Sequence, residues 1–372
     1  MKYKSIIVAT SALILQSAFI FAQVAPSHSK DLLVVVKGGR YGYIDHNGTV
    51  VIQPQFLWGS DFENCFAPVY LCSREVWIDE SGNVSALPAA NRDGLRAVRR
   101  EGKVGFVDGS GKLAISPIYD DSLPFSDGAA AVKIHGHWGF IGADGHEIIP
   151  PIYVSTFYFR EGVGIVESEN GYLLIDKSGA VLASRYEYLS GITSEGRVPV
   201  SRDEKHGYLD LHGKVTIPLE YESAGSFSNG LAPVEKGQRW GYIDRDGQTR
   251  VPFIFDEAGP FASGLAPVKL DGDSGFIDRT GAFAFRLAFE QASGFLTGDA
   301  DGMLTADTDV SRFWTKAHEF GYVNTTGKVI WGPTKENPDH WPLHGWSDRE
   351  KAESCKGIPE AMRQAVLKLP PE

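Results

Sequence analysis

The chain has 372 residues and a formal net charge of −11, from 47 acidic and 36 basic side chains. An acidic surface is repelled by nucleic-acid phosphates and by anionic membranes, so we expect no nucleic-acid partner. Three cysteines are too few to staple a fold of this size through disulfides.

The first residues predict an export signal. Lys2 and Lys4 precede an uncharged, largely apolar run from Ile6 to Ala22, and polar Gln23 follows. This order is typical of a secretory signal peptide, here residues 1–22, with a linker at residues 23–31 after the cleavage point. An uncleaved anchor is the alternative, but the run is shorter than the roughly 20 residues of a spanning helix. We therefore expect an exported protein, periplasmic or extracellular, with no transmembrane segment after signal cleavage.

Residues 32–332 carry nine copies of a phrase close to Trp-Gly-Tyr-Ile-Asp-x-x-Gly. We call the Asp position of this phrase the marker, and most successive markers are 34 residues apart. A period of this size is typical of arrays in which each small unit buries its apolar face against the next. The markers are Asp45, Asp79, Asp108, Gly142, Asp176, Asp210, Asp244, Asp278 and Asn324.

Each copy predicts three short strands, most clearly in the seventh. The first two strands there are residues 231–235 and 240–243, and the third is the Val-containing stretch before Pro252. Asp-x-x-Gly between the second and third strands is a turn sequence. Its carboxylate accepts backbone N–H groups, and its Gly adopts the left-handed conformation that returns the chain as a hairpin.

Period-2 alternation divides the second strand into two faces. The position two before the marker is aromatic in eight of the nine copies, with Leu174 as the exception. On the other face, Ile or Val alternates with Gly, whose missing side chain lets a ring or backbone lie close. We expect the aromatic positions to form the repeat core and to hold successive copies together. They are Tyr43, Trp77, Phe106, Phe140, Tyr208, Tyr242, Phe276 and Tyr322.

Three departures mark irregular places in the array. The second copy is five residues short and has Val76 in place of Gly. The fifth copy has Leu173 and Leu174 where Gly and an aromatic residue are expected. Before the last copy, twelve extra residues fall around residues 298–312, a stretch rich in Asp that we predict to be an exposed loop.

Residues 333–372 follow the repeats. Residues 333–342 predict a linker, and Ser347 to Glu350 has the spacing of a helix capping box. Pro359 is placed to open a second short helix, whose apolar face would carry Ile358, Met362, Val366 and Leu369. We expect this segment to be a helical cap over the open end of the array.

The predicted fold class is all-β: nine tandem β-meander repeats in an open, solenoid-like array, with a short helical C-terminal tail. Three strands in 34 residues suit such an array, and nine copies exceed the four to eight blades typical of a β-propeller. A β-propeller is the alternative. It requires a fourth strand in each copy, near the residues that precede the Phe of Phe-x-x-Gly-Leu-Ala-Pro-Val.

The two linked motifs, Trp-Gly-Tyr-Ile-Asp-x-x-Gly and Phe-x-x-Gly-Leu-Ala-Pro-Val, resemble the WG-repeat (KWG-repeat) family of bacterial exported proteins. The resemblance covers about Leu32 to Trp331, nearly all of the predicted mature chain. It implies an all-β repeat protein with no shared catalytic residues. Members of the family look like surface or periplasmic interaction modules.

The residues offer little for catalysis or for a cofactor. No Gly-x-Ser-x-Gly, His-Glu-x-x-His or Walker-type motif is present, and one Asp repeated at each turn is a turn residue. We therefore expect no enzyme activity, no cofactor and no metal. Weaker alternatives are a calcium site in the acidic loop and imidazole clusters in two places. The residues concerned are Asp299, Asp301, Gly302, Asp307 and Asp309 for calcium, and His135, His137, His146, His340 and His344 for the imidazoles.

Aromatic side chains carry the one broad binding argument. The position four before the marker lies near a hairpin edge, so Tyr41, Trp138 and Trp240 are our candidates for surface contacts. The predicted function is a non-enzymatic scaffold that mediates protein–protein interaction in the bacterial envelope. The alternative is a module that binds cell-wall or external glycans through these repeated aromatics.

Overall fold

The computed structural model describes residues 32–62, 66–71, 74–85, 94–189, 194–298, 304–336 and 358–367. The predicted signal peptide, the linker at residues 23–31, the capping-box segment and all three cysteines lie outside these ranges. Those expectations therefore stay predictions.

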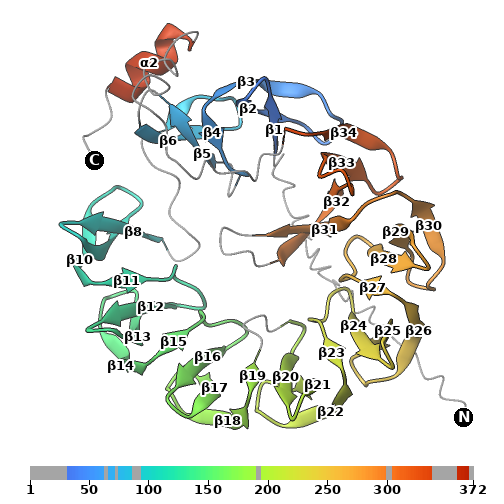
Figure 1. The fold of residues 1–372 in the computed structure, drawn as a ribbon. Helices are drawn as coiled ribbons and strands as arrows, with labels where there is room; N and C mark the ends of the chain where they lie inside the picture. The colour runs from blue at the N-terminus through green and yellow to red at the C-terminus, as the bar shows by residue number, and fades with distance from the viewer. Residues whose placement is uncertain are drawn as a thin grey trace, which may run out of the picture.

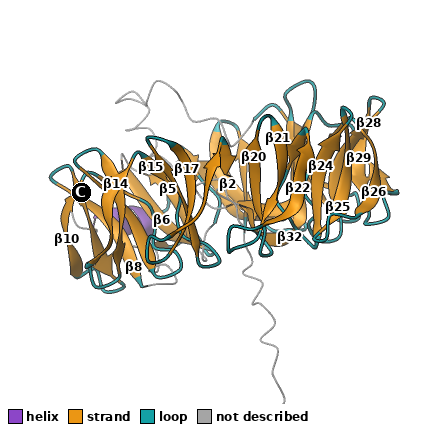
Figure 2. Cartoon of the chain, turned by 90° about the horizontal axis from the view of Figure 1, so that it is seen from below, coloured by secondary structure: helices purple, strands orange, loops and turns teal. Residues whose placement is uncertain are grey.

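Thirty-four strands within the described residues form nine antiparallel sheets, which we number as blades 1 to 9 in chain order. The blades stand around a ring (Figure 1), and their strands run along its axis, with hairpins at both faces (Figure 2). Blade 1 is β1 (Leu33–Lys37), β2 (Arg40–Ile44) and β3 (Val50–Phe56); blade 2 is β4 (Trp58–Gly59), β5 (Phe66–Leu71), β6 (Arg74–Asp79) and β7 (Val84–Ser85); blade 3 is β8 (Leu95–Arg100), β9 (Lys103–Asp108) and β10 (Leu113–Tyr119).

The next three blades have four strands each. Blade 4 is β11 (Asp121–Ser122), β12 (Ala129–Ile134), β13 (His137–Gly142) and β14 (Glu147–Tyr153); blade 5 is β15 (Ser155–Thr156), β16 (Val163–Ser168), β17 (Gly171–Asp176) and β18 (Val181–Tyr186); blade 6 is β19 (Tyr188–Leu189), β20 (Val198–Arg202), β21 (Lys205–Leu209) and β22 (Val215–Tyr221).

The last three blades follow the same order. Blade 7 is β23 (Ser223–Ala224), β24 (Leu231–Lys236), β25 (Arg239–Asp244) and β26 (Thr249–Phe255); blade 8 is β27 (Glu257–Ala258), β28 (Ala266–Leu270), β29 (Asp273–Ile277) and β30 (Phe283–Arg286); blade 9 is β31 (Gln291–Gly298), β32 (Leu304–Trp314), β33 (Phe320–Asn324) and β34 (Val329–Thr334).

The all-β repeat prediction is confirmed, but the open array is wrong: the nine blades form a β-propeller. A fourth strand lies on the inner side of most blades, just before the repeated Phe, as the alternative required. In blades 4 to 8 this strand has only two residues, for example Ser155–Thr156, so it is too short to show any alternation in the sequence. Three strands per copy was therefore an undercount.

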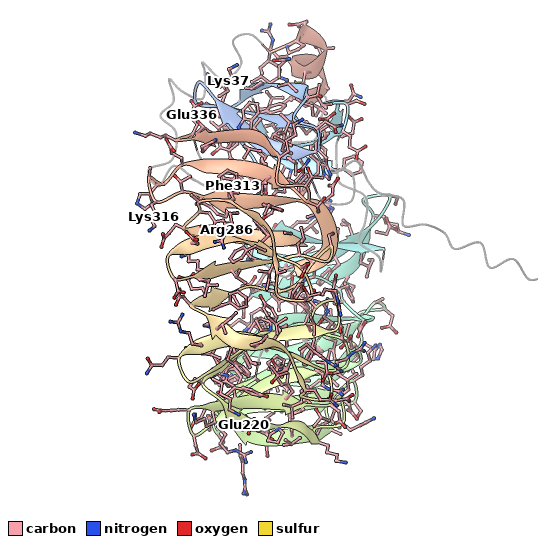
Figure 3. The ribbon with its side chains drawn as sticks, turned by 90° about the vertical axis from the view of Figure 1, so that its right-hand side faces the viewer. Lys37, Glu220, Arg286, Phe313, Lys316 and Glu336 are labelled. Atoms are coloured by element: carbon pink, nitrogen blue, oxygen red, sulfur yellow. The ribbon has the colours of Figure 1, made fainter. Side chains whose placement is uncertain are left out.

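The ring closes because blade 9 packs against blade 1. Val310, Phe320 and Tyr322 of blade 9 share one buried cluster with Val35 and Ile44 of blade 1. The Tyr322 hydroxyl also donates a hydrogen bond to the Val34 carbonyl, at 3.0 Å. At the rim, the Gly39 N–H donates to Glu336, and Figure 3 shows Lys37 and Glu336 together where the first and last blades meet. The first and last copies thus pack against each other through a shared apolar cluster, as neighbouring copies within the chain do.

The repeated Gly three residues before the marker is explained by a bulge in the outer strand. In blade 4, Trp138 pairs with Tyr153 and Phe140 with Ile149, so three residues of β14 oppose Gly139 alone. A Cβ on Gly139 would lie 2.6 Å from the Ile149 carbonyl oxygen and 2.7 Å from the Pro151 nitrogen. Backbone fills the space that a side chain would need, as the sequence predicted.

The fifth copy shows how the bulge changes when this Gly is absent. Leu173 stands at the Gly position, and β18 has no proline. Arg185 in β18 instead adopts a positive φ of 67°, so the outer strand bends by a different route.

The aromatic position two before the marker forms the core. Seven of the eight predicted residues are buried, and Leu174 takes the same place in blade 5. Five of these rings meet a Phe from the next blade, mostly edge to face. These pairs are Tyr43–Phe62, Phe106–Phe125, Phe140–Phe159, Tyr208–Phe227 and Tyr242–Phe261, with centroids 4.7 to 5.0 Å apart. The eighth residue, Trp77, is only half-buried.

The stretch predicted as an exposed loop before the last copy is mostly strand. β31 and β32 continue their pairing as far as Gly298 and Leu304, and this hairpin projects inward from the ring in Figure 1. Val310 and Ser311 in β32 are buried, because they face the first blade and the neighbouring strand. The expectation of a loop at residues 298–312 is therefore corrected; residues 299–303 lie outside the described chain.

The C-terminal helix α2 (Glu360–Leu367) covers the outside of the ring and not the end of an array. Ile358 and Val366 are buried in the core cluster shared by blades 1 and 2, and Met362 packs against it. The outer strand of blade 2, β7, has two residues where most other outer strands have six or seven. The helix therefore covers apolar surface that a full-length outer strand covers elsewhere.

Candidate interaction surfaces

The marker side chains form hydrogen bonds within their own turns. The Asp176 carboxylate accepts N–H groups from Ser178 and Ala180 at 2.8 and 3.0 Å, and the other Asp markers and Asn324 make the same pair of bonds. The hydroxyl of Ser178, followed by the Ala180 N–H, lowers the pKa of Asp176. These carboxylates are hydrogen-bond acceptors that close their own hairpins.

A second row of acidic residues joins neighbouring blades on the same face of the ring. The carboxylates of Asp127, Glu161 and Glu195 lie on tight turns. Each accepts a backbone N–H from the corresponding turn of the next blade, with distances of 2.8 to 3.1 Å. Arg245 adds an ion pair to Glu195 at 3.6 Å. These acids also have structural partners.

The opposite face carries ion pairs that repeat with the blades. Lys103 pairs with Asp120 at 2.5 Å, Lys205 with Glu222 at 3.2 Å, and Arg239 with Asp256. One position departs from this pattern. The residue equivalent to Asp120 between β14 and β15 is Val154, which is 47% exposed, whereas the one before β19 is Glu187. The row of acidic side chains on this rim is thus interrupted at Val154, which the sequence analysis did not single out.

The three aromatic residues expected at the surface are more buried than predicted. Tyr41 is only 6% exposed and belongs to the core of blades 1 and 2, so its expected surface position is corrected. Trp138 and Trp240 are half-buried and pack against the clusters of blades 4–5 and 7–8. The Lys133 ammonium lies 5.7 Å from the Trp138 ring centroid. These rings lie at a hairpin edge, but the bulged outer strand covers one side of them.

The candidate metal ligands do not converge in the part of the chain that is described. No group of three or more His, Cys, Asp or Glu residues suited to a metal occurs there. His146 contacts Asp144 of its own turn, and the Asp309 carboxylate contacts His46 across the blade 9–blade 1 junction. His135 and His137 lie on one hairpin. Asp299, Asp301, Gly302, His340 and His344, together with the Asp307 side chain, lie outside the described part.

One junction between neighbouring blades differs from the others in its apolar packing. Eight apolar clusters can be drawn from the described residues, and each joins two neighbouring blades. None of the eight joins blade 2 to blade 3. The ribbons of these two blades also stand apart in Figure 1. We call this junction the seam. It coincides with the one marker interval that is shortened, at 29 residues.

The face of blade 2 that points to blade 3 carries half-buried aromatic side chains and the exposed carboxylate of Glu75. Burial in β5 alternates strictly: Ala67, Val69 and Leu71 are buried, whereas Phe66, Pro68 and Tyr70 are half-buried. Trp77 lies opposite Pro68 on the half-buried side. In blade 7 the residues equivalent to Phe66, Pro68 and Trp77 are all buried against blade 8. They are Leu231, Pro233 and Tyr242.

The face of blade 3 that points to blade 2 carries arginine. Arg96 lies opposite Val107, a place taken in the other blades by Leu33, Ala67, Ala130, Gly164, Val198, Ala232, Ala266 or Ser311. Arg96 is half-buried, and desolvation lowers the pKa of its guanidinium. Arg100 lies on the same face, because it is four residues further along the strand. A side chain of this size and charge prevents the close sheet packing seen at the other junctions.

A shallow groove of about 510 Å³ runs beside α2 on the outside of the ring. Its walls are β3, the second marker hairpin and the helix, with Ile52, Asn83, Met362 and Ala365 among the lining residues. No described helix is both long and apolar enough to span a bilayer.

Comparison with known proteins agrees with the tandem repeats predicted from the sequence. A family model described as WG containing repeat matches residues 41–70, 105–136, 138–172, 207–240 and 240–272. No curated protein sequence matches the chain.

Among solved structures, a crystal structure described as the eukaryotic initiation factor is similar over 83% of this chain and 97% of its own, with 11% identity and a TM-score of 0.57. BamB from Moraxella catarrhalis aligns over 65% of this chain and 85% of its own, with 14% identity and a TM-score of 0.41. At such identities a likeness concerns the fold alone. The repeat matches show that the chain belongs to the WG containing repeat family.

Proposed function

We propose that this protein is a non-enzymatic scaffold of the bacterial envelope that holds protein partners on a rigid ring. The observation that carries the proposal is that the repeated polar groups form hydrogen bonds within the ring itself. Marker carboxylates close their own hairpins, and the acidic turns bind the next blade's backbone. The repeat therefore builds a surface and a frame, and its polar residues are occupied in doing so.

The residues at the N-terminus support an envelope location. Residues 1–22 have the order of charge, apolar run and small residue that is typical of a secretory signal. An exported ring with an acidic surface remains soluble and disfavours phosphate-rich partners.

Capture from the native envelope fraction tests the proposal. The purified chain, tagged at the C-terminus, is expected to retain specific proteins that a tagged control of equal charge does not. Partner-free recovery, or turnover of a small molecule by the purified chain, would contradict a scaffold role.

Carbohydrate binding is the second candidate, because Trp138 and Trp240 keep part of their rings exposed. A glycan array separates the two functions. Selective binding that is lost in Trp138→Ala and Trp240→Ala favours the glycan reading; binding that is absent or unchanged in both variants favours the scaffold.

A further inference from the structure

We propose that the groove beside α2 binds an extended, uncharged segment of a partner protein, which adds to the outer edge of β3 as a further strand. This inference rests on the proposed scaffold function and names the surface and the chemistry of the partner. Three observations carry it: the course of the groove along a strand edge, the helix that forms its second wall, and the lack of charge among its described lining residues.

The groove follows the outer edge of β3. Three consecutive residues of this strand, Val51, Ile52 and Gln53, line it together with Gln55. Successive side chains of a strand point to opposite faces, so a groove over a single face would meet alternate residues only. Within the described chain, β3 pairs with β2 on its inner side and with no strand on its outer side. An extended segment in the groove therefore lies where the next strand of the sheet would lie.

The helix gives this edge a second wall. Ala361, Met362 and Ala365 of α2 line the groove, and the hairpin residues 81–84 of blade 2 line it as well. The outer strands of blades 4 to 8 also end their sheets, but α2 is the one helix among the described residues, so none of those edges has a helix beside it there. A strand added between an edge and a helix has apolar contacts on the side that a bare edge leaves in water.

The lining favours an uncharged occupant. The twelve described lining residues are all apolar, small or neutral and polar, although 22% of the chain is charged. A carboxylate or ammonium group of a partner would lose water in this groove and meet no opposite charge from these residues. Val51 and Met362 provide apolar surface on the two walls. The carboxamides of Gln53 and Gln55 offer donors and acceptors to a peptide backbone or to hydroxyl groups.

The length of the bound segment follows from β3. At about 3.3 Å per residue, the strand from Val51 to Gln55 covers about 13 Å, which corresponds to about five residues of a paired segment. Valine, isoleucine and threonine suit this segment, because β-branched side chains favour the extended backbone and carry no charge. A nucleic acid would bring phosphates to a neutral groove on an acidic protein.

The test uses the full chain and a fluorescein-labelled peptide, Gly-Ser-Val-Thr-Val-Thr-Val-Ser-Gly, with binding measured by fluorescence anisotropy. One control peptide has Glu in place of the three Val. Two others keep every side chain but carry N-methyl groups, either on the Val residues or on the Thr residues. A strand paired along one edge directs only alternate N–H groups to its neighbour.

We expect the Glu peptide to bind at least tenfold more weakly than the parent peptide. One N-methylated peptide should also lose at least tenfold in affinity, while the other should stay within about threefold of the parent. Equal losses in the two methylated peptides, or no binding of the parent peptide, would overturn the proposal.

Variants place the site. Val51→Glu should weaken binding of the parent peptide at least tenfold, and because Val51 is 47% exposed the change leaves the core intact. Ala365→Trp should do the same by filling the groove. The matched controls are Val181→Glu in β18, which is 54% exposed, and Gln364→Trp on the exposed side of α2. Both controls should leave binding unchanged, and losses equal to those of the groove variants would contradict the site.

Two other occupants of the groove are separated by the same assay. A chain that ends at Leu367 tests whether residues 368–372 fill the groove, and sedimentation velocity of the full chain tests a second copy. Peptide binding that becomes at least tenfold tighter in the shortened chain would assign the groove to the chain's own tail. A dimer that Val51→Glu abolishes would assign it to a second copy. Either result would overturn the proposal.

Capture from the envelope fraction keeps this inference separate from the scaffold function. Loss of captured proteins in Val51→Glu but not in Val181→Glu supports the groove as the scaffold's binding site. If both variants capture the same proteins as the wild type, the scaffold function stands and the groove is not its site.

Discussion

Gly139→Ala is the sharpest test of why Gly precedes the aromatic and the marker in this repeat. Gly139 has no positive φ, so alanine meets no backbone strain. Its Cβ would instead lie 2.6 Å from the Ile149 carbonyl oxygen, 2.7 Å from the Pro151 nitrogen and 2.8 Å from the Pro150 carbonyl carbon. Ordinary contact distances there are 3.4 to 4 Å, so the backbone of β14 must move by roughly 1 Å.

The energetic cost follows from what moves. Added methyl groups in packed sites cost about 1–3 kcal/mol when neighbours must shift. Here the obstacles are three backbone atoms of a bulge that carries prolines, and Ile149 and Tyr153 of the same strand belong to the blade 4–blade 5 core. We therefore expect a loss near the upper end, about 2–3 kcal/mol in the free energy of unfolding.

Gly142→Ala is the matched control, three residues later in the same strand. Its Cβ would meet the His146 ring and the Asp144 carboxylate at 2.8 to 3.0 Å, and these exposed side chains can rotate away. We expect a cost within about 0.5 kcal/mol, as for ordinary surface changes.

Urea unfolding, followed by tryptophan fluorescence and by hydrogen exchange of the β13 and β14 amides, measures both variants. Exchange is needed because repeat proteins lose cooperativity between distant units. Equal stability of Gly139→Ala and Gly142→Ala would refute the explanation of the repeated Gly.

Three further predictions concern the core, the turns and the helix. Tyr242→Phe removes a buried hydroxyl that donates to the Gly259 carbonyl at 2.8 Å, and we expect a loss of about 1–2 kcal/mol in the free energy of urea unfolding; an unchanged midpoint would contradict this. The pKa values of six markers, including Asp176, lie below the ordinary aspartate value of 3.8, so their stabilisation is complete above that value and is lost as the pH falls through the folded pKa. Protection of the blade 5 hairpin amides against hydrogen exchange should therefore fall below about pH 4, less so in Asp176→Asn, and protection insensitive to acid would argue against the carboxylate's role. Val366→Asp places a charge in the core of blades 1 and 2 and should speed exchange of the β3 and β6 amides, whereas Gln364→Ala on the exposed side of α2 should not.

The local unit was predictable because its signals are chemical and short-range. Asp at the marker predicts a turn that its carboxylate closes, and Gly139 and its equivalents predict a close backbone approach. Alternation in the second strand identified the core face, where Tyr208 and Tyr242 are fully buried. These inferences needed only the side-chain period and the donor and acceptor groups of a hairpin.

Closure was not predictable by the same reasoning. Ring closure depends on the angle between successive blades, and no single residue determines that angle. The short inner strands, such as Ser155–Thr156, have two residues and no detectable period, so the count of strands per copy was too low. Tyr41 illustrates another limit: its place near a hairpin suggested exposure, but Phe56 of the bulged outer strand lies directly opposite it.

The seam lay partly within reach of the sequence. The 29-residue interval and Val76 marked the second copy as irregular. The arginine at position 96 was a further signal, since the aligned positions are small, aliphatic or Ser311. Its meaning required the register, which shows that this side chain points at the neighbouring blade.

The most direct test of ring closure is a distance between the first and last blades. Spin labels are placed at Asn47 and Thr326, each two residues after its marker and exposed, after serine replacement of the three native cysteines. His212 and Asp246 occupy the same positions in adjacent blades 6 and 7 and provide the reference pair. Electron–electron double resonance should give the two pairs the same short distance distribution. A distance for Asn47 and Thr326 that corresponds to the length of an extended nine-unit array would contradict the closed ring.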